Sequence, residues 1–439
     1  MNKKAVTKFQ AVVITVIIVI AVIAGVAYYY GSLPAPTPTV TPTIPPEKAA
    51  ILIGASVSQT GKWSAAGVQI RDSFIFAINM INAKGGVYVG GRYLPLLLIW
   101  YDDASDATKC ITNYEKLITV DKVDFVMGPY GGALNLAVLP TWEKYGKLGF
   151  FQAVGDELYE YGYKYAFGLY KGSSYTVLFV RWMADLLKDP AIPEHQKIRK
   201  IASICTDDTS GKYTYIGLER ALAQTGAQIE IVCKEFIPLG ATDLSPYLLK
   251  AAAAGAEALI LGTKIDQSII AARQIESLGL KFKAIWCGGG PTYPAWAELG
   301  PTGYYYFSVS WWTPRLKTQG TLLRSKIEWS NEKLVKDFKL TYGYDLDARG
   351  INAMISIFAL ADAIERAGTL ETEAVAMALK ETKLMTPSGL LVFGPDNAWD
   401  DKYAPYYLVQ YFPDGYYIVY PEKVDTTPIA ERPMIYPIP

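Results

Sequence analysis

From Ile51 onward, the chain alternates between short, continuously apolar runs and segments whose apolar residues recur with helical spacing. Ile51–Val57 is a run of the first kind, whereas the apolar residues from Ile70 to Ile81 fall on one helix face that ends at Gly85-Gly86. Strands that alternate with helices of this length predict parallel sheets with helices on both faces. Further strands are expected at Leu94–Trp100, Val123–Met127, Leu148–Gln152, Ile198–Cys205, Gln228–Phe236, Ala258–Leu261 and Lys283–Cys287. Further helices are expected at Asp106–Ile118, Ala133–Tyr145, Tyr213–Thr225, Leu244–Ala254 and Gln267–Leu278.

The alternation occurs in two consecutive runs, which predicts two sheets and therefore two lobes in one α/β body. Of the 439 residues, roughly 390 remain after the N-terminal segments, and a chain of that length favours two domains. Helical segments resembling those of the first run return late in the sequence. We therefore expect a first lobe at 49–171 and 310–385, a second lobe at 172–309 and 386–425, and a C-terminal tail at 426–439.

The N-terminus predicts a segment that carries the body outside the cell. Three lysines precede the uncharged run Phe9–Tyr30, which is long enough to cross a bilayer with its start in the cytoplasm. Residues 1–30 are therefore expected to be a signal or membrane-anchor helix. Residues 4–7 (KAVT) also resemble the pilin-like leaders of archaeal surface proteins. Residues 31–48 are rich in Pro and Thr and predict a semi-rigid stalk. We expect the body on the outer face of the membrane, either anchored or released after leader processing.

The composition argues against several classes of function. Lys+Arg and Asp+Glu balance at 42 each, so no long-range field attracts nucleic acid. His195 is the single histidine and lies in a polar stretch, which disfavours a Ser-His-Asp triad or a His-rich zinc site. Gly61-Lys62 and the glycines from Gly288 to Gly290 lack the spacing of nucleotide-binding loops. We therefore expect no catalysis, no cofactor, no metal and no nucleic-acid partner.

The four cysteines, Cys110, Cys205, Cys233 and Cys287, show no metal-ligand spacing. Each is compatible with a buried, small apolar residue. Cys205 and Cys233 lie in successive expected strands, and an extracellular location permits oxidation. A disulfide between these two cysteines is therefore an open alternative.

A series of motifs in the expected loops and helices has a recognisable order. Together they resemble the leucine/isoleucine/valine-binding family of ABC-transporter solute-binding proteins, from about Ala50 to Thr382. The helix expected at Ala348–Ala367 fits the same resemblance. The motifs are, in order, Ile53-Gly54-Ala55, Ser58-x-Thr60-Gly61, Ile78-Asn79-Met80-Ile81-Asn82-Ala83-Lys84-Gly85-Gly86, Gly91-Arg92, Asp102-Asp103-Ala104-Ser105-Asp106, Val126-Met127-Gly128-Pro129-Tyr130 and Ala271-Ala272-Arg273-Gln274-Ile275-Glu276-Ser277-Leu278-Gly279-Leu280.

The resemblance implies a type I periplasmic-binding-protein fold, with two Rossmann-like lobes joined by three crossovers and a ligand between them. It also implies a function, the capture of a small solute and its delivery to the permease subunits of an ABC importer. A ligand-sensing receptor module on the same fold is the alternative. Such a module needs a signalling domain, and the few residues before Phe9 are too short to provide one.

In open parallel sheets the ligand binds beyond the carboxyl ends of the strands. Backbone N–H groups there suit a carboxylate, and aromatic rings suit a flat group. In the second lobe, Lys264 is expected either to meet an anionic group or to pair with Asp266. Asp102-Asp103 is expected to cap the following helix, with Asp103 or Ser105 accepting its first N–H groups. The expected ligand contacts are Gln59, Trp63, Ala66, Tyr130, Gly131, Gly132, Gln152, Ala153, Val154, Asp208, Ser210, Lys264 and Gly289.

The chain also departs from the family pattern at three of these positions. Gly132 and Val154 stand where the family has hydroxyl side chains, and Gly289 stands where many members carry an acid for the ligand's ammonium group. An ammonium without a partner is costly to desolvate, and three small residues suggest a roomier pocket. We therefore expect leucine, isoleucine and valine to bind weakly or not at all. Amides, aromatic acids or short peptides are the expected ligands.

Overall fold

The computed structural model describes residues 48–424, 427–428 and 430–438. The membrane helix expected at 1–30, and the stalk up to residue 47, lie outside the described residues. Within the described ranges, no helix combines the length and the apolar character that a membrane crossing requires.

The first sheet is parallel and has the strand order β4-β1-β5-β6-β7. Two helices cover each face: α2 and α11 pack with one set of buried side chains, and α3 and α4 pack with another. Its strands are β1 (Ile51–Val57), β4 (Leu96–Asp102), β5 (Phe125–Tyr130), β6 (Gly149–Gln152) and β7 (Ala166–Phe167). The helices are α2 (Ser64–Asn82), α3 (Ala107–Thr119), α4 (Gly132–Lys144) and α11 (Ala348–Ala367).

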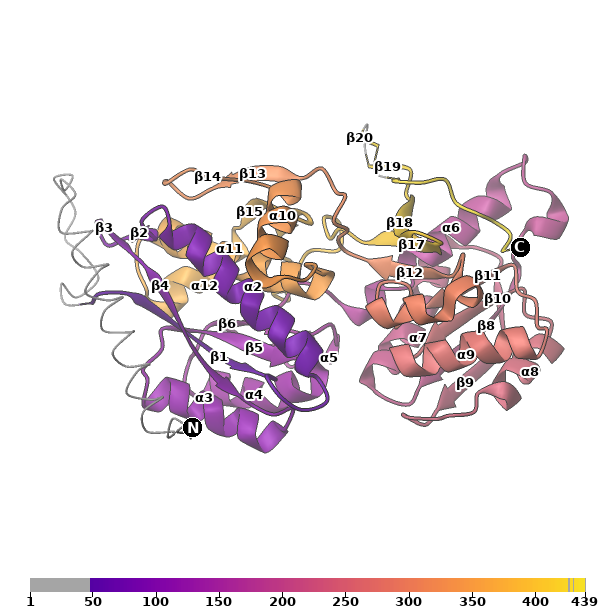
Figure 1. Cartoon of the computed structure of the whole chain (residues 1–439), viewed down its shortest axis with the longest axis horizontal. Coiled ribbons are helices and arrows are strands. Elements are labelled where there is room, and N and C mark those ends of the chain that lie inside the picture. Colours follow the sequence, from indigo (N-terminus) through magenta and orange to yellow (C-terminus); the bar gives the residue numbers. More distant parts are fainter. Residues whose placement is uncertain (1–47, 425–426, 429, 439) are drawn as a thin grey trace, which may run out of the picture. The chain divides into compact units, whose positions relative to one another are not determined.

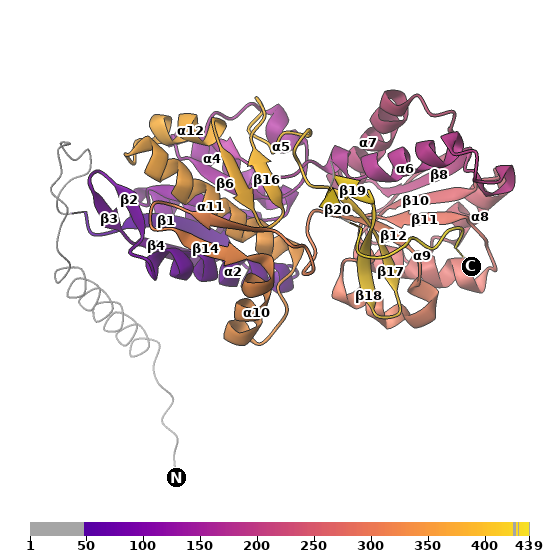
Figure 2. The ribbon, with the colours of Figure 1, turned by 90° about the horizontal axis from the view of Figure 1, so that it is seen from above.

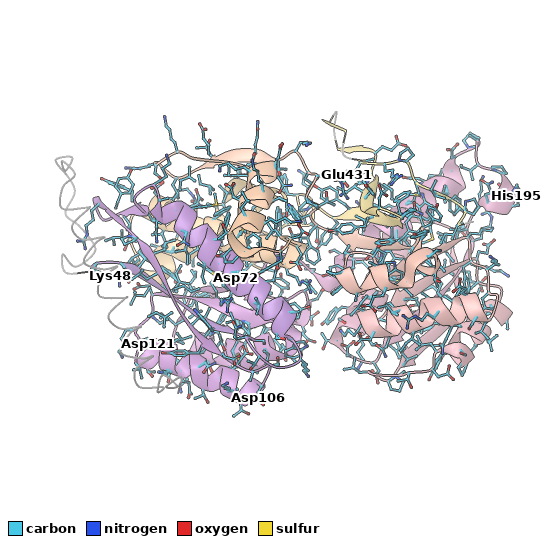
Figure 3. The ribbon with its side chains drawn as sticks, in the orientation of Figure 1. Lys48, Asp72, Asp106, Asp121, His195 and Glu431 are labelled. Atoms are coloured by element: carbon cyan, nitrogen blue, oxygen red, sulfur yellow. The ribbon has the colours of Figure 1, made fainter. Side chains whose placement is uncertain are left out.

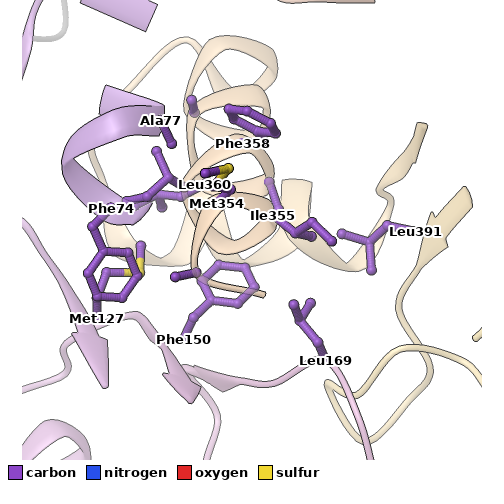
Figure 4. Close-up of a cluster of buried hydrophobic side chains, with 14 of the residues drawn as sticks. Phe74, Ala77, Met127, Phe150, Leu169, Met354, Ile355, Phe358, Leu360 and Leu391 are labelled. Atoms are coloured by element: carbon purple, nitrogen blue, oxygen red, sulfur yellow. The ribbon is translucent and has the colours of Figure 1, made fainter. Parts of the chain in front are cut away.

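The core of this lobe joins segments that are far apart in the sequence. Helix α11 packs against α2, although more than 260 residues separate them (Figure 1). Apolar side chains of α2 and of the strands interdigitate with those of α11 (Figure 4). Phe74, Met127, Phe150 and Phe358 are fully buried. This packing explains why a helix late in the chain belongs to the first lobe.

The second sheet has the strand order β18-β17-β12-β11-β10-β8-β9, in which β17 runs antiparallel to both of its neighbours, β12 and β18, and the other pairings are parallel. Helices α6 and α7 cover one face, and α8 and α9 the other (Figure 2). The strands are β8 (Lys200–Thr206), β9 (Glu230–Ile237), β10 (Ala258–Gly262), β11 (Ala284–Cys287), β12 (Phe307–Ser310), β17 (Tyr407–Phe412) and β18 (Gly415–Tyr420). The helices are α6 (Val177–Lys188), α7 (Thr209–Thr225), α8 (Ser245–Ala253) and α9 (Ile265–Ser277).

The chain passes between the two sheets three times, after β7, after β12 and before β17. The second pass leads to helices that pack with the first sheet, and the third returns to the second sheet. The other helical segments are α5 (Glu157–Glu160), α10 (Asn331–Tyr342), α12 (Thr372–Lys380), η1 (Gly172–Ser174), η2 (Glu194–Gln196) and η3 (Pro294–Gly303). The other strands pair as β2 (Val87–Val89) with β3 (Arg92–Leu94), β13 (Gln319–Leu322) with β14 (Ile327–Ser330), β15 (Lys383–Thr386) with β16 (Gly389–Val392), and β19 (Lys423–Val424) with β20 (Thr427–Pro428).

One strand differs in its placement from the sequence-based expectation. Residues 386–425 were expected in the second lobe, but β16 pairs with β15 and does not join the seven-stranded sheet. Leu391 of β16 is buried in the same cluster as Phe150 and Ile355. The apolar side of this hairpin therefore completes the core of the first lobe.

The expected disulfide between Cys205 and Cys233 is wrong, because all four cysteines are free and buried. Strands β8 and β9 are neighbours, but Cys205 stands opposite Phe236 and Cys233 opposite Ala202. That offset of three residues corresponds to about 10 Å along a strand, which is beyond the reach of a disulfide. The two thiols also pack into different clusters, Cys205 with α6 and α7 and Cys233 with α8 and α9.

This burial makes the thiols unreactive in the folded protein. Burial raises the pKa of Cys110 to about 12 and that of Cys205 to about 11, and only the thiolate reacts. We expect no fast reaction of the folded chain with Ellman's reagent at pH 8, and release of four equivalents in denaturant, one per cysteine. A count of two in denaturant without reductant would instead indicate a disulfide.

Candidate functional site

The turn between β5 and α4 forms one part of the carboxyl edge of the first sheet. Gly131 has φ 88°, a backbone conformation that favours glycine, and its N–H donates to the Gln152 carbonyl at 3.1 Å. The Asn135 side chain donates to the Gly131 carbonyl at 2.7 Å and holds the turn in place. A Cβ atom added at Gly131 or Gly132 would meet no heavy atom within 4 Å. There is therefore room for a ligand beside this turn.

The segment that follows β6 connects this edge to α11. The Gln152 side chain is buried and donates to Ser356 Oγ of α11 at 2.9 Å, so its amide already has a structural partner. Ala153 packs toward α3 and α4, whereas Val154 packs toward α2 and α11. Ligand contacts by the backbone of these three residues remain a prediction.

The expected contact residues of the β1 loop and the start of α2 have contacts within the protein. The Gln59 side chain accepts a hydrogen bond from Arg71, and Ala66 is buried within α2. Trp63 packs against the α3–α4 cluster and lies under Lys62, whose Nζ is 4.4 Å from the ring centroid. Tyr130 packs against the α2–α11 cluster instead. Trp63 and Tyr130 therefore pack against different clusters.

Asp103 has a different role from the expected helix cap. Asp106 caps α3, accepting from the Lys109 N–H at 2.8 Å. Asp103 is fully buried and accepts from Ser58 Oγ at 2.6 Å and from Ser56 Oγ at 3.2 Å. It therefore joins the end of β1 to the end of β4. Its neighbour Asp102 accepts from Thr60 Oγ1 at 2.7 Å and holds the β1 loop in the same way.

On the second sheet, the structure brings Asp208, Ser210 and Lys264 together as the sequence predicted. Lys264 Nζ lies 2.7 Å from Asp208 Oδ2 and also donates to Ser210 Oγ. Asp208 caps α7, accepting from the Gly211 N–H at 3.1 Å. Burial disfavours the charge of Asp208, but hydrogen bonds from Lys264 and Thr206 outweigh it and lower the pKa of the carboxyl. The expected ion pair between Lys264 and Asp266 is not formed, because Lys264 pairs with Asp208 instead.

Gly289 does not enlarge the site, contrary to the expectation of a roomier pocket at this position. Its N–H donates to the Thr263 carbonyl at 2.9 Å. A Cβ atom here would lie 2.6 Å from the Ile265 nitrogen and 2.8 Å from the Lys264 carbonyl carbon. The space that a side chain would need is already filled by the backbone at the start of α9.

Three residues that the sequence did not predict connect the carboxyl edges of the two sheets. Arg349, in the first turn of α11, lies over the ring of Tyr293 from the loop after β11, with its guanidinium carbon 5.2 Å from the centroid. Asp347 caps α11 and binds the Arg349 guanidinium, with Nε to Oδ2 at 2.7 Å. The proximity of Tyr130, together with burial, raises the pKa of Tyr293. The position of Asp347, just before the expected helix, could have predicted the N-cap. Nothing in the sequence predicts the contact between Arg349 and the ring of Tyr293.

Further contacts join the same two edges. Tyr213 of α7 donates to Glu160 of α5 at 2.8 Å. A Cβ atom at Gly155, just after β6, would lie 3.5 Å from Thr209 Cγ2 at the start of α7. The carboxyl ends of both sheets therefore contribute to one region of the body.

His195 lies in η2, before β8 and away from these edges (Figure 3). Among the described residues, no group of three or more His, Cys, Asp or Glu side chains is arranged to hold a metal ion.

Comparison with known proteins identifies the family. A family model described as "Periplasmic binding protein" matches residues 50–415. The chain belongs to this family.

The relatives of this periplasmic binding protein include solute-binding proteins of several bacteria. A Leu/Ile/Val-binding protein homolog of Brucella melitensis is 26% identical over 250 residues, which cover 56% of this chain and 60% of the relative. The chain thus matches about three fifths of that relative's length. A putative branched-chain amino acid ABC transporter from Silicibacter pomeroyi has a similar fold, with a TM-score of 0.74, 18% identity, and coverage of 88% and 99%. A solute-binding protein from R. palustris in complex with benzoate gives a TM-score of 0.66 at 15% identity, with coverage of 88% and 97%.

These similarities confirm the expected type I periplasmic-binding-protein fold and its two parallel sheets. The edges of the periplasmic binding protein present hydrogen-bond donors, tyrosine rings and one partly exposed ion pair on each side. Such an arrangement suits reversible binding of a small polar or flat molecule. The list of thirteen expected contacts remains a prediction for the binding of a ligand.

Proposed function

We propose that this protein captures a small organic solute outside the cell and delivers it to the permease subunits of an ABC importer, without catalysing a reaction. Membership of the periplasmic binding protein family supports this proposal. The observation that carries it is the meeting of the two carboxyl edges, where Arg349 of the first sheet's helices contacts Tyr293 of the second sheet. A site built from both lobes can couple ligand binding to their relative arrangement, which a permease can then recognise.

The proposal includes a place for the protein at the cell surface. Residues 1–30 would act as a signal or anchor helix and residues 31–48 as a stalk, so that the body faces the outside. The description of the family as periplasmic binding proteins supports this location of the body. Release of the protein from membranes by carbonate at high pH, compared with release by detergent only, tests whether the N-terminal segment anchors it.

We expect the full-length chain, purified in detergent, to bind one small solute per molecule. Native mass spectrometry of protein exposed to a metabolite mixture should show a single adduct, because one pair of edges forms one site. Protein unfolded in guanidinium, stripped by dialysis and refolded serves as the ligand-free control. If neither native nor refolded protein takes up any member of a broad mixture, solute binding is not its function.

A further inference from the structure

The start of α11 holds a partly buried arginine, Arg349, whose ionic partner Asp347 is fully occupied. The Asp347 carboxylate accepts from the backbone N–H groups of Arg349 and Gly350, both at 2.9 Å. The same carboxylate accepts from Nε and Nη2 of the Arg349 guanidinium. Four N–H groups therefore share one carboxylate, which leaves Asp347 little capacity for anything else.

The rest of the guanidinium faces the meeting of the two edges. The Arg349 side chain is 23% exposed, and within the described part of the chain its Nη1 has no hydrogen-bond partner. Its guanidinium lies over Tyr293, which is close to Tyr130. An arginine with a free N–H pair beside two aromatic rings can receive a planar anion.

The surrounding charges favour an anion at this point. Helices α4, α7 and α9 begin at the carboxyl ends of their strands, and α11 begins beside Tyr293, so that four positive helix ends are directed to one region. The acids that cap α7 and α11 are neutralised by partners, Asp208 by Lys264 and Asp347 by Arg349, whereas Asp266 in the first turn of α9 is exposed to solvent. The two ion pairs sum to zero, and the helix dipoles add a positive potential that Asp266 offsets in part.

The aromatic side chains in the same place favour a flat ligand. Tyr175 lies near both Tyr130 and Tyr293 and is 5.9 Å from the ring of Trp311. The Trp311 Nε1–H donates to the Ala348 carbonyl at 3.0 Å, which fixes this ring at the start of α11. With open space at Gly131 and Gly132 beside Tyr130, these rings offer surfaces on which a flat body can stack.

From these contacts we infer that the ligand is a monocarboxylate carried on a flat, unsaturated body, and that Arg349 binds its carboxylate. This inference rests on the proposed function and names the ligand class of the same site. A zwitterionic amino acid would also need a carboxylate for its ammonium group. Glu157, beside Thr209 at the start of α7, has a buried oxygen without a hydrogen-bond partner, but burial raises the pKa of this carboxyl and so disfavours the charged form that an ammonium group needs.

Four probes separate the chemical features of the ligand. Isothermal titration of the full-length chain in detergent would compare benzoate with benzamide, which lacks the charge, and with cyclohexanecarboxylate, which lacks the flat ring. Leucine tests the zwitterion. We expect benzoate to bind at least about tenfold more tightly than benzamide, since a charge-assisted hydrogen bond alone supports such a factor. Benzoate should also bind more tightly than cyclohexanecarboxylate and leucine, because neither has a flat face to stack on the tyrosine rings. Equal or tighter binding of benzamide or leucine would overturn the inference.

Two substitutions at the ion pair have opposite expected effects. Arg349→Gln should weaken benzoate binding by about ten- to hundredfold, because it removes the charged donor. Asp347→Asn keeps a helix-capping side chain but frees the guanidinium, so benzoate should bind as tightly as before or more tightly. If Arg349 served only to neutralise Asp347, the two variants would weaken binding alike, and that result would contradict the assignment.

Controls separate ligand contact from loss of structure. Arg366, at the other end of α11, pairs with Asp362 at 2.8 Å, and Arg366→Gln should leave benzoate affinity unchanged. Glu157→Gln should also leave it unchanged, whereas a loss of leucine binding in that variant would support a zwitterion instead. Failure of the proposed function is distinct, because it would appear as no binding of any solute in the metabolite mixture.

Discussion

Replacing Asp103 with alanine is expected to lower the free energy of unfolding by about 3–5 kcal/mol, because several buried donors would lose their acceptor at once. Asp103, Ser56 and Ser58 are fully buried. Both serine hydroxyls donate to the carboxylate, as does the backbone N–H of Ser105 at 2.8 Å. Guanidinium-induced unfolding followed by tryptophan fluorescence measures the loss.

The effect of this substitution should depend on pH. Burial raises the pKa of Asp103, although hydrogen bonds from Ser58, Ser105 and Ser56 lower it in part. The folded state therefore holds this proton up to a higher pH than the unfolded state does. As pH falls through the raised pKa, wild-type protein gains stability that the alanine variant cannot gain. The difference between the two should widen from neutral pH toward the ordinary pKa of aspartate.

Asp106→Ala is the matched control for Asp103→Ala. Asp106 caps α3 through one exposed hydrogen bond, to the Lys109 N–H, and its loss should cost about 0.5–2 kcal/mol with little change over the same pH range. If Asp103→Ala lowered the free energy of unfolding no more than Asp106→Ala does, the buried contacts between β1 and β4 would contribute little to stability.

Much of the fold could be predicted from hydrophobic periodicity. Helix Ala348–Ala367 has the expected bounds, and α4 and β11 lie within one residue of the expected ones. The spacing of apolar residues shows which side of a single segment is buried. It therefore predicts helices and strands that bury one side along their whole length. The short hairpins, such as β13–β14, and β12 were missed because strands of four residues carry too few apolar positions to show a period.

The candidate site was less predictable, for a physical reason. Asp208, Ser210 and Lys264 could be placed together because each follows a strand of one sheet, and the ends of parallel strands share an edge. Arg349 and Tyr293 meet across the two sheets, and no rule of strand order gives that contact. The prediction of the disulfide was wrong for a similar reason. The sequence indicated that the two strands are neighbours, but it did not indicate their register.

The second large effect concerns Gly289, which packs against the start of α9. Gly289→Ala is expected to lower the free energy of unfolding by about 2–4 kcal/mol, because the added methyl group would collide with backbone and not with a movable side chain. The atoms involved belong to Thr263, Lys264 and Ile265, between 2.6 and 2.8 Å from the added Cβ. Relief of the collision requires α9 to shift, and Lys264 would shift with it.

The neighbouring Gly288 provides the matched control. A Cβ atom there would meet its nearest atoms, in Trp286, at 3.5 Å, an ordinary van der Waals contact. Gly288→Ala should therefore unfold at nearly the wild-type denaturant concentration, whereas Gly289→Ala should unfold at a clearly lower one. For the same reason Gly289→Glu should not create leucine binding, since its carboxylate cannot enter the site without displacing the start of α9. Leucine binding by a stable Gly289→Glu variant would contradict this expectation. It would mean that the backbone at the start of α9 can move to accommodate the side chain, and that an acid at this position suffices for amino-acid recognition.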